Sequence, residues 1–161
     1  MPELLRLEHF GFTYPQQPCP ALADVSLTVR QGEFWVLCGA SGCGKTTLLR
    51  QLKPALRPHG AAEGRILFDG QPLDDLPPHR QAADIGFVLQ SPEEQTVTDK
   101  VWHELAFGLE SLGCDTPSIR RRVAEMASFF GIQDWFHRKV DELSGCLLYT
   151  SPSPRDPKTS R

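Results

Sequence analysis

The pattern of apolar and polar residues predicts strands in the first half of the chain. The stretch 4–14 looks like a strand that is broken at Pro15, and apolar and polar positions alternate over 25–29, as they do in strands with one buried face. The stretch 64–70 is also strand-like and ends in an Asp-Gly turn. Two runs, 33–38 and 85–89, are almost continuously apolar and predict buried strands.

Helical spacing replaces this pattern after Pro92. Over 98–112 apolar residues recur at intervals of three and four, and the same spacing returns over 117–130. Gly131 suits the C-terminal end of the second helix, and a third short helix is expected over 133–139. The second half of the chain is therefore predicted to be helical.

A glycine-rich run at 39–46, Gly-Ala-Ser-Gly-Cys-Gly-Lys-Thr, fits the phosphate-loop pattern G-x-x-x-x-G-K-[ST]. It lies between a predicted strand and a helical stretch at 47–52, so its free backbone N–H groups favour an anion. Lys45 is expected to reach the β- and γ-phosphates, and the Thr46 hydroxyl to hold Mg²⁺. The candidate nucleotide-contacting residues are Gly39, Ala40, Ser41, Gly42, Cys43, Gly44, Lys45, Thr46 and Thr47.

Composition narrows the remaining possibilities. The chain has 161 residues, 40% of them hydrophobic, and a formal net charge of −3, which gives no support for nucleic-acid binding. No apolar run approaches the roughly 20 residues that span a bilayer. The cysteines have no C-x-x-C spacing and the histidines no metal-site spacing, so thiols in a reducing compartment are favoured over disulfides or zinc. Cys43 lies inside the phosphate loop, where alkylation would be expected to block nucleotide binding.

Three further features, taken with the loop, resemble the nucleotide-binding subunit of an ABC transporter. Tyr14 stands where that family has an aromatic residue that stacks on adenine. Gln90 matches the family's glutamine that contacts Mg²⁺ and the attacking water, which makes it a candidate catalytic residue with Lys45. The signature motif, which binds the γ-phosphate of the partner subunit's ATP, is matched at its start by Leu143, Ser144 and Gly145.

The resemblance implies an α/β fold of the P-loop NTPase type in two parts. Residues 1–97 are expected to form the ATP-binding core, with antiparallel strands and the phosphate loop, and residues 98–145 the helical subdomain. Residues 146–161 resemble a translated sequencing adapter and are expected to be a non-native, disordered tail; a real Pro/Ser-rich tail is the alternative. The later core strands and the family's Mg²⁺-binding Asp, catalytic Glu and switch His are then missing, so we expect a truncated, inactive and unstable chain.

A more specific resemblance concerns the segment after Gln90. The pattern Q-x-P-x-x-Q at 90–95 and the Ala-Phe-Gly at 106–108 resemble the ATPases of energy-coupling factor transporters, which import vitamins or transition-metal ions. The resemblance implies ATP and Mg²⁺ as cofactors and a peripheral position on the cytoplasmic face of the membrane. It also implies three partners: a second ABC ATPase subunit, a transmembrane transporter subunit and a substrate-capture membrane protein.

Two alternatives remain open at this point. The chain could be a non-transport ABC ATPase, although the long insertions or basic surfaces that such proteins usually carry are absent from its sequence. It could also be a nucleotide-binding module that does not hydrolyse ATP.

Overall fold

The computed structural model describes residues 2–91, 95–140 and 142–143. By their internal contacts the residues divide into two compact units, Met1–Phe87 and Val88–Arg161. Each unit is described by itself below. The expected domain boundary at residue 97 stays a prediction, and the expected tail lies outside the described residues.

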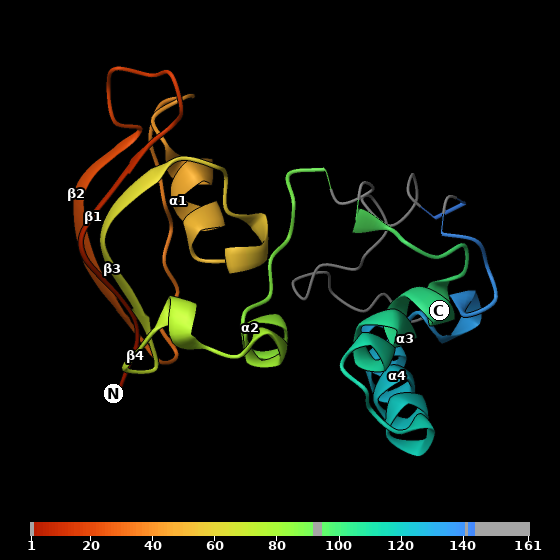
Figure 1. Ribbon diagram of the computed structural model, residues 1–161. Coiled ribbons are helices and arrows are strands. Elements are labelled where there is room, and N and C mark those ends of the chain that lie inside the picture. The colour runs from red at the N-terminus through yellow and green to blue at the C-terminus, as the bar shows by residue number, and fades with distance from the viewer. Residues whose placement is uncertain (1, 92–94, 141, 144–161) are drawn as a thin grey trace, which may run out of the picture. The chain divides into compact units, whose positions relative to one another are not determined.

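The first unit is built on a four-stranded antiparallel sheet (Figure 1). Its strands are β1 (Glu3–Thr13), β2 (Leu22–Arg30), β3 (Ala61–Phe68) and β4 (Gln71–Pro72), in the order β2-β1-β3-β4. The alternating stretches predicted as strands all lie in this sheet, which confirms them. The expected Asp-Gly turn joins β3 to β4.

A bulge in β1 keeps its large side chains on one face of the sheet. His9 has a φ of 47°, and the pairing register shifts there against both neighbouring strands. The shift inserts one residue, so Leu7 and Phe10 are three residues apart and both are buried. Gly64 lies against the bulge with a φ of 77°, and a Cβ there would collide with the carbonyl oxygens of Glu8 and His9.

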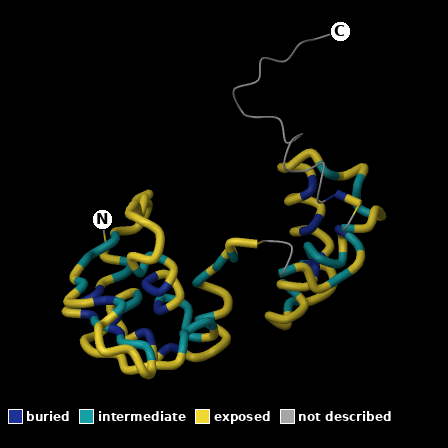
Figure 2. The backbone as a smooth tube through the Cα atoms, turned by 90° about the horizontal axis from the view of Figure 1, so that it is seen from above, coloured by how far each residue is buried: buried dark blue, intermediate teal, exposed yellow. Residues whose placement is uncertain are grey.

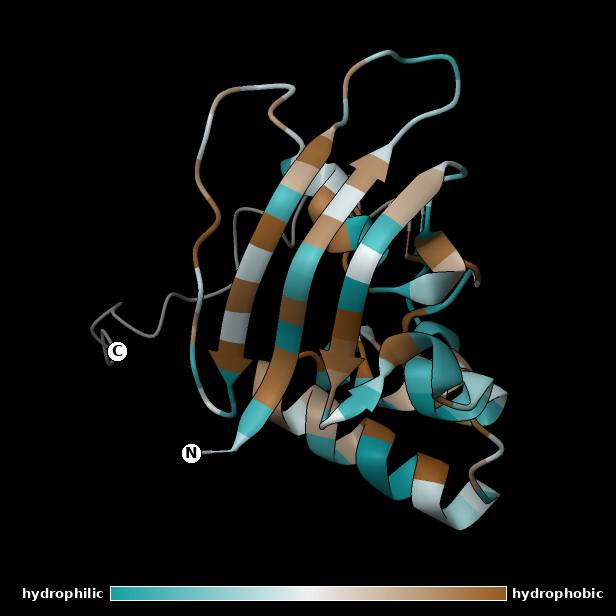
Figure 3. Ribbon diagram, turned by 60° about the vertical axis from the view of Figure 1, so that its left-hand side comes forward, coloured by the Kyte–Doolittle hydropathy of each residue, from teal (hydrophilic) through white to brown (hydrophobic). Residues whose placement is uncertain are grey.

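The buried face of the sheet carries the core of this unit. Helix α1 (Lys45–Gln51) packs on it through Leu48, and two 3-10 turns, η1 (Pro54–Leu56) and η2 (Leu73–Asp75), follow along the chain. Figure 2 shows these buried positions in dark blue, and Figure 3 shows apolar and polar residues alternating along the strands. Each buried Leu- or Phe-sized side chain contributes about 1.5–3 kcal/mol relative to an exposed one. The buried cluster consists of Leu7, Phe10, Phe12, Leu22, Leu48, Ile66, Leu73 and Leu76.

The prolines between Pro72 and Arg80 predict a linker, but the structure of this segment is more regular than that. It contains η2 and the first three residues of helix α2 (Pro78–Asp84), which begins with a proline at its first position. Proline fits the first turn of a helix because the N–H group that it lacks has no helical partner there. The linker prediction was therefore wrong over 73–75 and 78–80, where the chain forms η2 and begins α2.

The two apolar runs predicted as buried strands are not strands in the structure. Residues 33–38 and 85–89 have no strand assignment, and Phe34 and Trp35 are 89% and 55% exposed. A strand needs a neighbour for its backbone hydrogen bonds, and the described sheet offers none to either run. These predictions were wrong for the described residues, because apolar composition without a pairing partner does not make a strand.

The second unit is helical, as predicted. It contains α3 (Val101–Ser111), α4 (Thr116–Phe130) and the 3-10 turn η4 (Gln133–Trp135), so the third expected helix is only a short turn. Ala106, Ile119 and Val123 form its buried cluster. Gly131 ends α4 in the left-handed conformation, which confirms the predicted helix stop. No helix in the described part of the chain has both the length and the apolarity needed to cross a membrane.

The start of α4 makes the stability of this unit depend on pH. Asp115 caps the helix by accepting a hydrogen bond of 3.1 Å from the Ser118 N–H. Hydrogen bonds from the side chain and backbone of Ser118 lower the pKa of this carboxyl below its ordinary 3.8. The stabilisation is therefore complete above pH 3.8 and is lost as pH falls through the lower pKa of the folded state.

We predict that α4 loses stability in acid relative to an Asp115→Asn variant. Asparagine also caps helices but does not titrate, so its contribution stays constant with pH. Urea unfolding followed by the helical circular-dichroism signal, at pH values on both sides of 3.8, compares the two proteins. Parallel pH profiles of the two proteins would contradict the assignment of this cap.

Candidate functional site

The phosphate loop packs directly against the start of β2. Gly44, the last residue before α1, has a φ of 92°, a conformation that other residues rarely adopt. A Cβ at Gly44 would lie 2.7 Å from the Ala21 carbonyl oxygen and 3.0 Å from Cδ2 of Leu22. Only glycine fits here, for both its backbone conformation and its lack of a side chain.

Lys45 folds back into the loop that precedes it. Its Nζ donates hydrogen bonds to the carbonyl oxygens of Gly39 (2.9 Å) and Ala40 (2.7 Å) and lies 3.4 Å from Cys43 Sγ. An ammonium group has three donors, and sulfur is a weak acceptor, so a phosphate oxygen can readily replace the sulfur contact. The structure therefore holds the cation inside the loop, with its weakest bond available for exchange.

The exposed residues of the loop leave it open to a ligand. Ala40, Ser41, Gly42 and Cys43 are exposed. Thr46, the predicted Mg²⁺ ligand, is also exposed in the first turn of α1. The loop therefore presents an ammonium group and an accessible hydroxyl on two residues that are adjacent in the sequence, Lys45 and Thr46.

Tyr14 and Thr47 come together although they are far apart in the sequence. Tyr14 follows the end of β1, and its Oη lies 2.9 Å from Oγ1 of Thr47, which is buried in α1. The Tyr14 ring also packs edge-on against Phe12, with ring centres 4.9 Å apart. Two contacts thus fix an aromatic ring beside the helix that begins in the phosphate loop.

The segment that enters the loop starts with a tight polar turn. The Glu33 carboxylate accepts hydrogen bonds from the backbone N–H of Arg30 and from Nε1 of Trp35, both 2.9 Å long. The Arg30 bond, followed by the Trp35 bond, lowers the pKa of Glu33 below its ordinary value. This exposed carboxylate therefore closes the turn after β2.

The remaining candidate residues belong to the second unit. Gln90 is exposed there, and its role beside Thr46 stays a prediction. Leu143 is buried and its N–H donates to the Val140 carbonyl oxygen at 3.0 Å. Ser144 and Gly145 lie outside the described residues, so the signature-motif assignment also stays a prediction.

Sequence reasoning missed the residues that support the loop. Ala21 and Leu22 pack against the loop, and this contact is evident only from the short distances between them and Gly44 in the structure. Lys53, just beyond α1, binds two backbone carbonyls of the segment 81–85 and was not singled out. The only sequence signal for Lys53 is its place after a helix end, which many surface lysines share.

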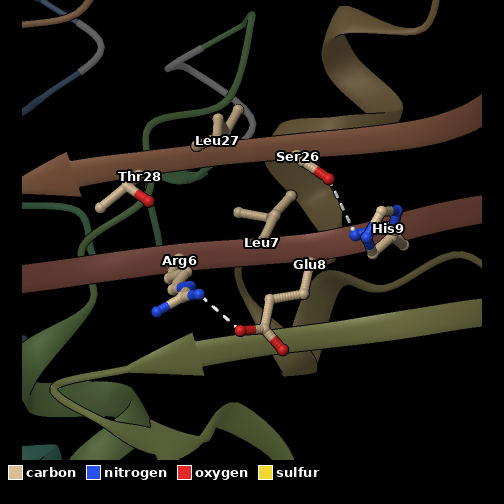
Figure 4. Close-up of a pocket in the computed structure, with 7 residues that line it drawn as sticks. All are labelled: Arg6, Leu7, Glu8, His9, Ser26, Leu27 and Thr28. Carbon is tan, nitrogen blue, oxygen red and sulfur yellow. Dashed lines mark hydrogen bonds and ion pairs between the residues drawn. The ribbon is translucent and has the colours of Figure 1, made fainter.

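A hollow of about 510 Å³ on the sheet offers little for recognition. It is lined by Arg6, Leu7, Glu8, His9, Ser26, Leu27 and Thr28 (Figure 4). The Arg6 guanidinium is paired with Glu8 at 3.0 Å, and the His9 N–H donates to Ser26 Oγ, so these polar groups are already satisfied. Within the described ranges, no three His, Cys, Asp or Glu residues lie together in a way that could hold a metal ion.

We predict that Gly44→Ala destabilises the first unit more than Gly42→Ala does. Both positions have positive φ, so each alanine costs about 1–2 kcal/mol of backbone strain. Gly42 has open space around it, whereas a Cβ at Gly44 meets Ala21, and this overpacking adds about 1–3 kcal/mol. Equal losses in thermal unfolding would show that the contact with β2 is not tight.

Comparison with known proteins places the loop in a family. The family model described as "ABC transporter" matches residues 22–147. An ABC transporter ATP-binding protein of Bacillus cereus is 45% identical over 139 residues, which cover 86% of this chain and 25% of that protein. A cobalt import ATP-binding protein of Syntrophus aciditrophicus is 35% identical, with 88% of this chain and 50% of that protein covered.

A solved structure agrees with the sequence comparisons. The structure of cbiO1 from Clostridium perfringens, part of the ABC transporter complex cbiONQ, superposes with a TM-score of 0.73 and 26% identity. The match covers 86% of this chain and 55% of that one. This chain thus spans between a quarter and about half the length of these relatives. From the family match and the shared fold, the chain belongs to the ABC transporter family of ATP-binding proteins.

Proposed function

We propose that this chain is the ATP-binding part of an ABC-type ATPase that drives the import of a small solute across a membrane. The observation that carries the proposal is the loop at 39–46, with the Lys45 ammonium held inside it, in a chain of this family. ATP is the ligand class that such a loop is built to hold, because its charge sits on the phosphates that the loop cradles.

The printed functions of two relatives support a proposal for the cargo and the partners. One relative is a cobalt import protein of Syntrophus aciditrophicus, and another is an energy-coupling factor transporter protein of Lacticaseibacillus paracasei, 34% identical over 145 residues. We therefore propose a vitamin or a transition-metal ion as cargo. The proposed partners are a transmembrane subunit, a second ATPase subunit and a substrate-capture membrane protein, which would place the chain at the cytoplasmic face of the membrane.

Different residues of this chain are proposed to bind different parts of ATP and its Mg²⁺. Lys45 and the backbone N–H groups of the loop orient the phosphates, and Tyr14 offers its ring to the adenine. Thr46 and Gln90 would hold Mg²⁺, which when bound neutralises charge on the β- and γ-phosphates. Such a site works by positioning and electrostatics, because phosphoryl transfer needs little covalent chemistry from the protein.

The start of the signature motif has a different proposed role. Leu143 is buried. Ser144 and Gly145 are proposed to bind the γ-phosphate of ATP held by a second subunit. Two subunits would therefore share each nucleotide, which is why a second ATPase subunit is part of the proposal.

We predict that Lys45→Ala weakens ATP binding about tenfold or more. Loss of a charge-assisted hydrogen bond costs about 1.5–3 kcal/mol, and about 1.4 kcal/mol corresponds to a factor of ten in Kd. Titration calorimetry with Mg-ATP measures the change. Arg50→Ala is the matched control, because it removes an exposed positive charge from the same helix. Equal Kd values for the wild type and Lys45→Ala would refute the proposed site.

A further inference from the structure

Tyr14 is restrained at its backbone, at its ring and at its hydroxyl group. The Gln17 N–H donates to the Tyr14 carbonyl oxygen at 3.2 Å, and Gln16 has a φ of 63°. With Pro15 in the second position, this is the pattern of a type II turn. The turn holds the backbone of Tyr14 directly after β1, so it sets the direction in which the side chain leaves the main chain.

The ring of Tyr14 lies against a tightly packed neighbour. Phe12 is 2% exposed, and its ring packs edge-on against the Tyr14 ring with the centres 4.9 Å apart. Gly60 encloses Phe12 from another side, because a Cβ added at Gly60 would lie only 2.5 Å from Cζ of the Phe12 ring. This contact supports one side of the Tyr14 ring, and a different contact holds its hydroxyl end.

Thr47 provides that second contact. Its Oγ1 lies 2.9 Å from Oη of Tyr14, and Thr47 is only 8% exposed, so water has little access to its hydroxyl group. A threonine in a helix has few side-chain rotamers, because its Cβ is branched. The position of the Thr47 hydroxyl is therefore set by α1, the helix that begins at Lys45 of the phosphate loop.

The ring and the phosphate loop lie in the same unit of the structure. Thr47 follows Lys45 by two residues, a rise of about 3 Å along the axis of α1. The hydrogen bond to Thr47 thus ties the Tyr14 ring to the same short helix that carries the Lys45 ammonium. The base and the terminal phosphates of ATP are at opposite ends of one molecule, so a preorganised distance between their two binding places favours affinity.

We propose that Thr47 is a positioning residue, whose hydroxyl group holds the Tyr14 ring in the orientation that receives the adenine base. The inference rests on the proposed function, in which this ring stacks on adenine. A ring that is already held loses little freedom when the base binds, whereas a released ring must be ordered, and that ordering weakens binding. The Thr47 hydroxyl therefore acts on the part of ATP affinity that comes from the base.

The test is a double-mutant cycle that compares ATP with inorganic triphosphate, which has the phosphates but no base. The measured quantity is the Kd of triphosphate divided by the Kd of ATP, both from titration calorimetry of the full 161-residue chain in excess Mg²⁺. A loss of phosphate binding affects both constants and cancels in this ratio. Wild type, Tyr14→Phe, Thr47→Val and the double variant are compared. Phenylalanine keeps an aromatic ring for stacking, and Thr47→Ser, which keeps a hydroxyl group, is the rescue variant.

The proposal predicts that Tyr14→Phe lowers this ratio about threefold, the effect of ordering one side chain on binding. Thr47→Val lowers it by a similar factor, and the double variant loses no more than either single variant, because both changes break the same bond. Thr47→Ser restores most of the ratio. The matched control, Thr28→Val, leaves it at the wild-type value, because Thr28 pairs with Arg6 near the start of β1, whereas Tyr14 follows its end.

Other results would overturn the inference. An unchanged ratio in Tyr14→Phe, or losses of the two single variants that simply multiply, would show that the bond does not position the ring. A ratio in Thr47→Ser as low as in Thr47→Val would make Thr47 a packing residue only. If Thr47→Val lowers the folded fraction, Tyr14→Phe removes the other end of the same bond and must still lower the ratio. Equal binding of ATP and triphosphate by the wild type would also overturn it, whereas failure to bind either ligand would instead refute the proposed function.

Discussion

The contact between the Gly44 backbone and the start of β2 is the constraint on which the rest of the first unit depends. It leaves no space for a side chain, and it brings the phosphate loop against Ala21 and Leu22. Leu22 belongs to the buried cluster that joins the sheet to α1. The loop is therefore held by the core itself, which is why an exposed, glycine-rich segment can keep a defined shape. The Lys45 bonds to Gly39 and Ala40 then close the loop from within.

Hydrogen bonds of polar side chains hold both ends of α1 against neighbouring segments. Tyr14 joins the end of β1 to Thr47 at the start of the helix, and Lys53 and Arg57 join its end to α2 and η2. These bonds connect segments that are distant in sequence, whereas the apolar cluster fixes only the general packing. Apolar composition alone does not position a segment. The run 33–38 is strongly apolar, but no strand of the described residues lies beside it, and it is exposed.

Most of the fold could be predicted from local signals. Apolar and polar patterns located β1 and β2, and a strand-like run before an Asp-Gly turn located β3. The three- and four-residue spacing located α3 and α4, because such spacing reports which face of a helix is buried. The bulge at His9 could not be predicted, since it depends on Gly64 in a strand far along the chain. The runs 33–38 and 85–89 were predicted wrongly, because strand formation is a property of two segments and the pattern describes only one.

The candidate site also has parts that the sequence predicts and parts that depend on contacts between distant residues. The phosphate loop was evident in the sequence because its chemistry lies in eight consecutive residues. Tyr14 was found through a family resemblance, but its bond to Thr47 is a tertiary contact that no pattern shows. The supports at Ala21 and Lys53 act through backbone oxygens, which every residue has, so sequence alone offers no sign of them.

The central claim is that this loop binds the phosphates of a nucleotide, and its most direct test varies the phosphates alone. Titration calorimetry of the chain with ATP, ADP and AMP keeps the adenosine constant while phosphates are removed. A loop that cradles the β- and γ-phosphates binds ATP and ADP and loses about tenfold or more of its affinity for AMP, which lacks those charge-assisted bonds. Equal affinity for ATP, ADP and AMP would show that the loop makes no contact with the β- and γ-phosphates, and would contradict the account.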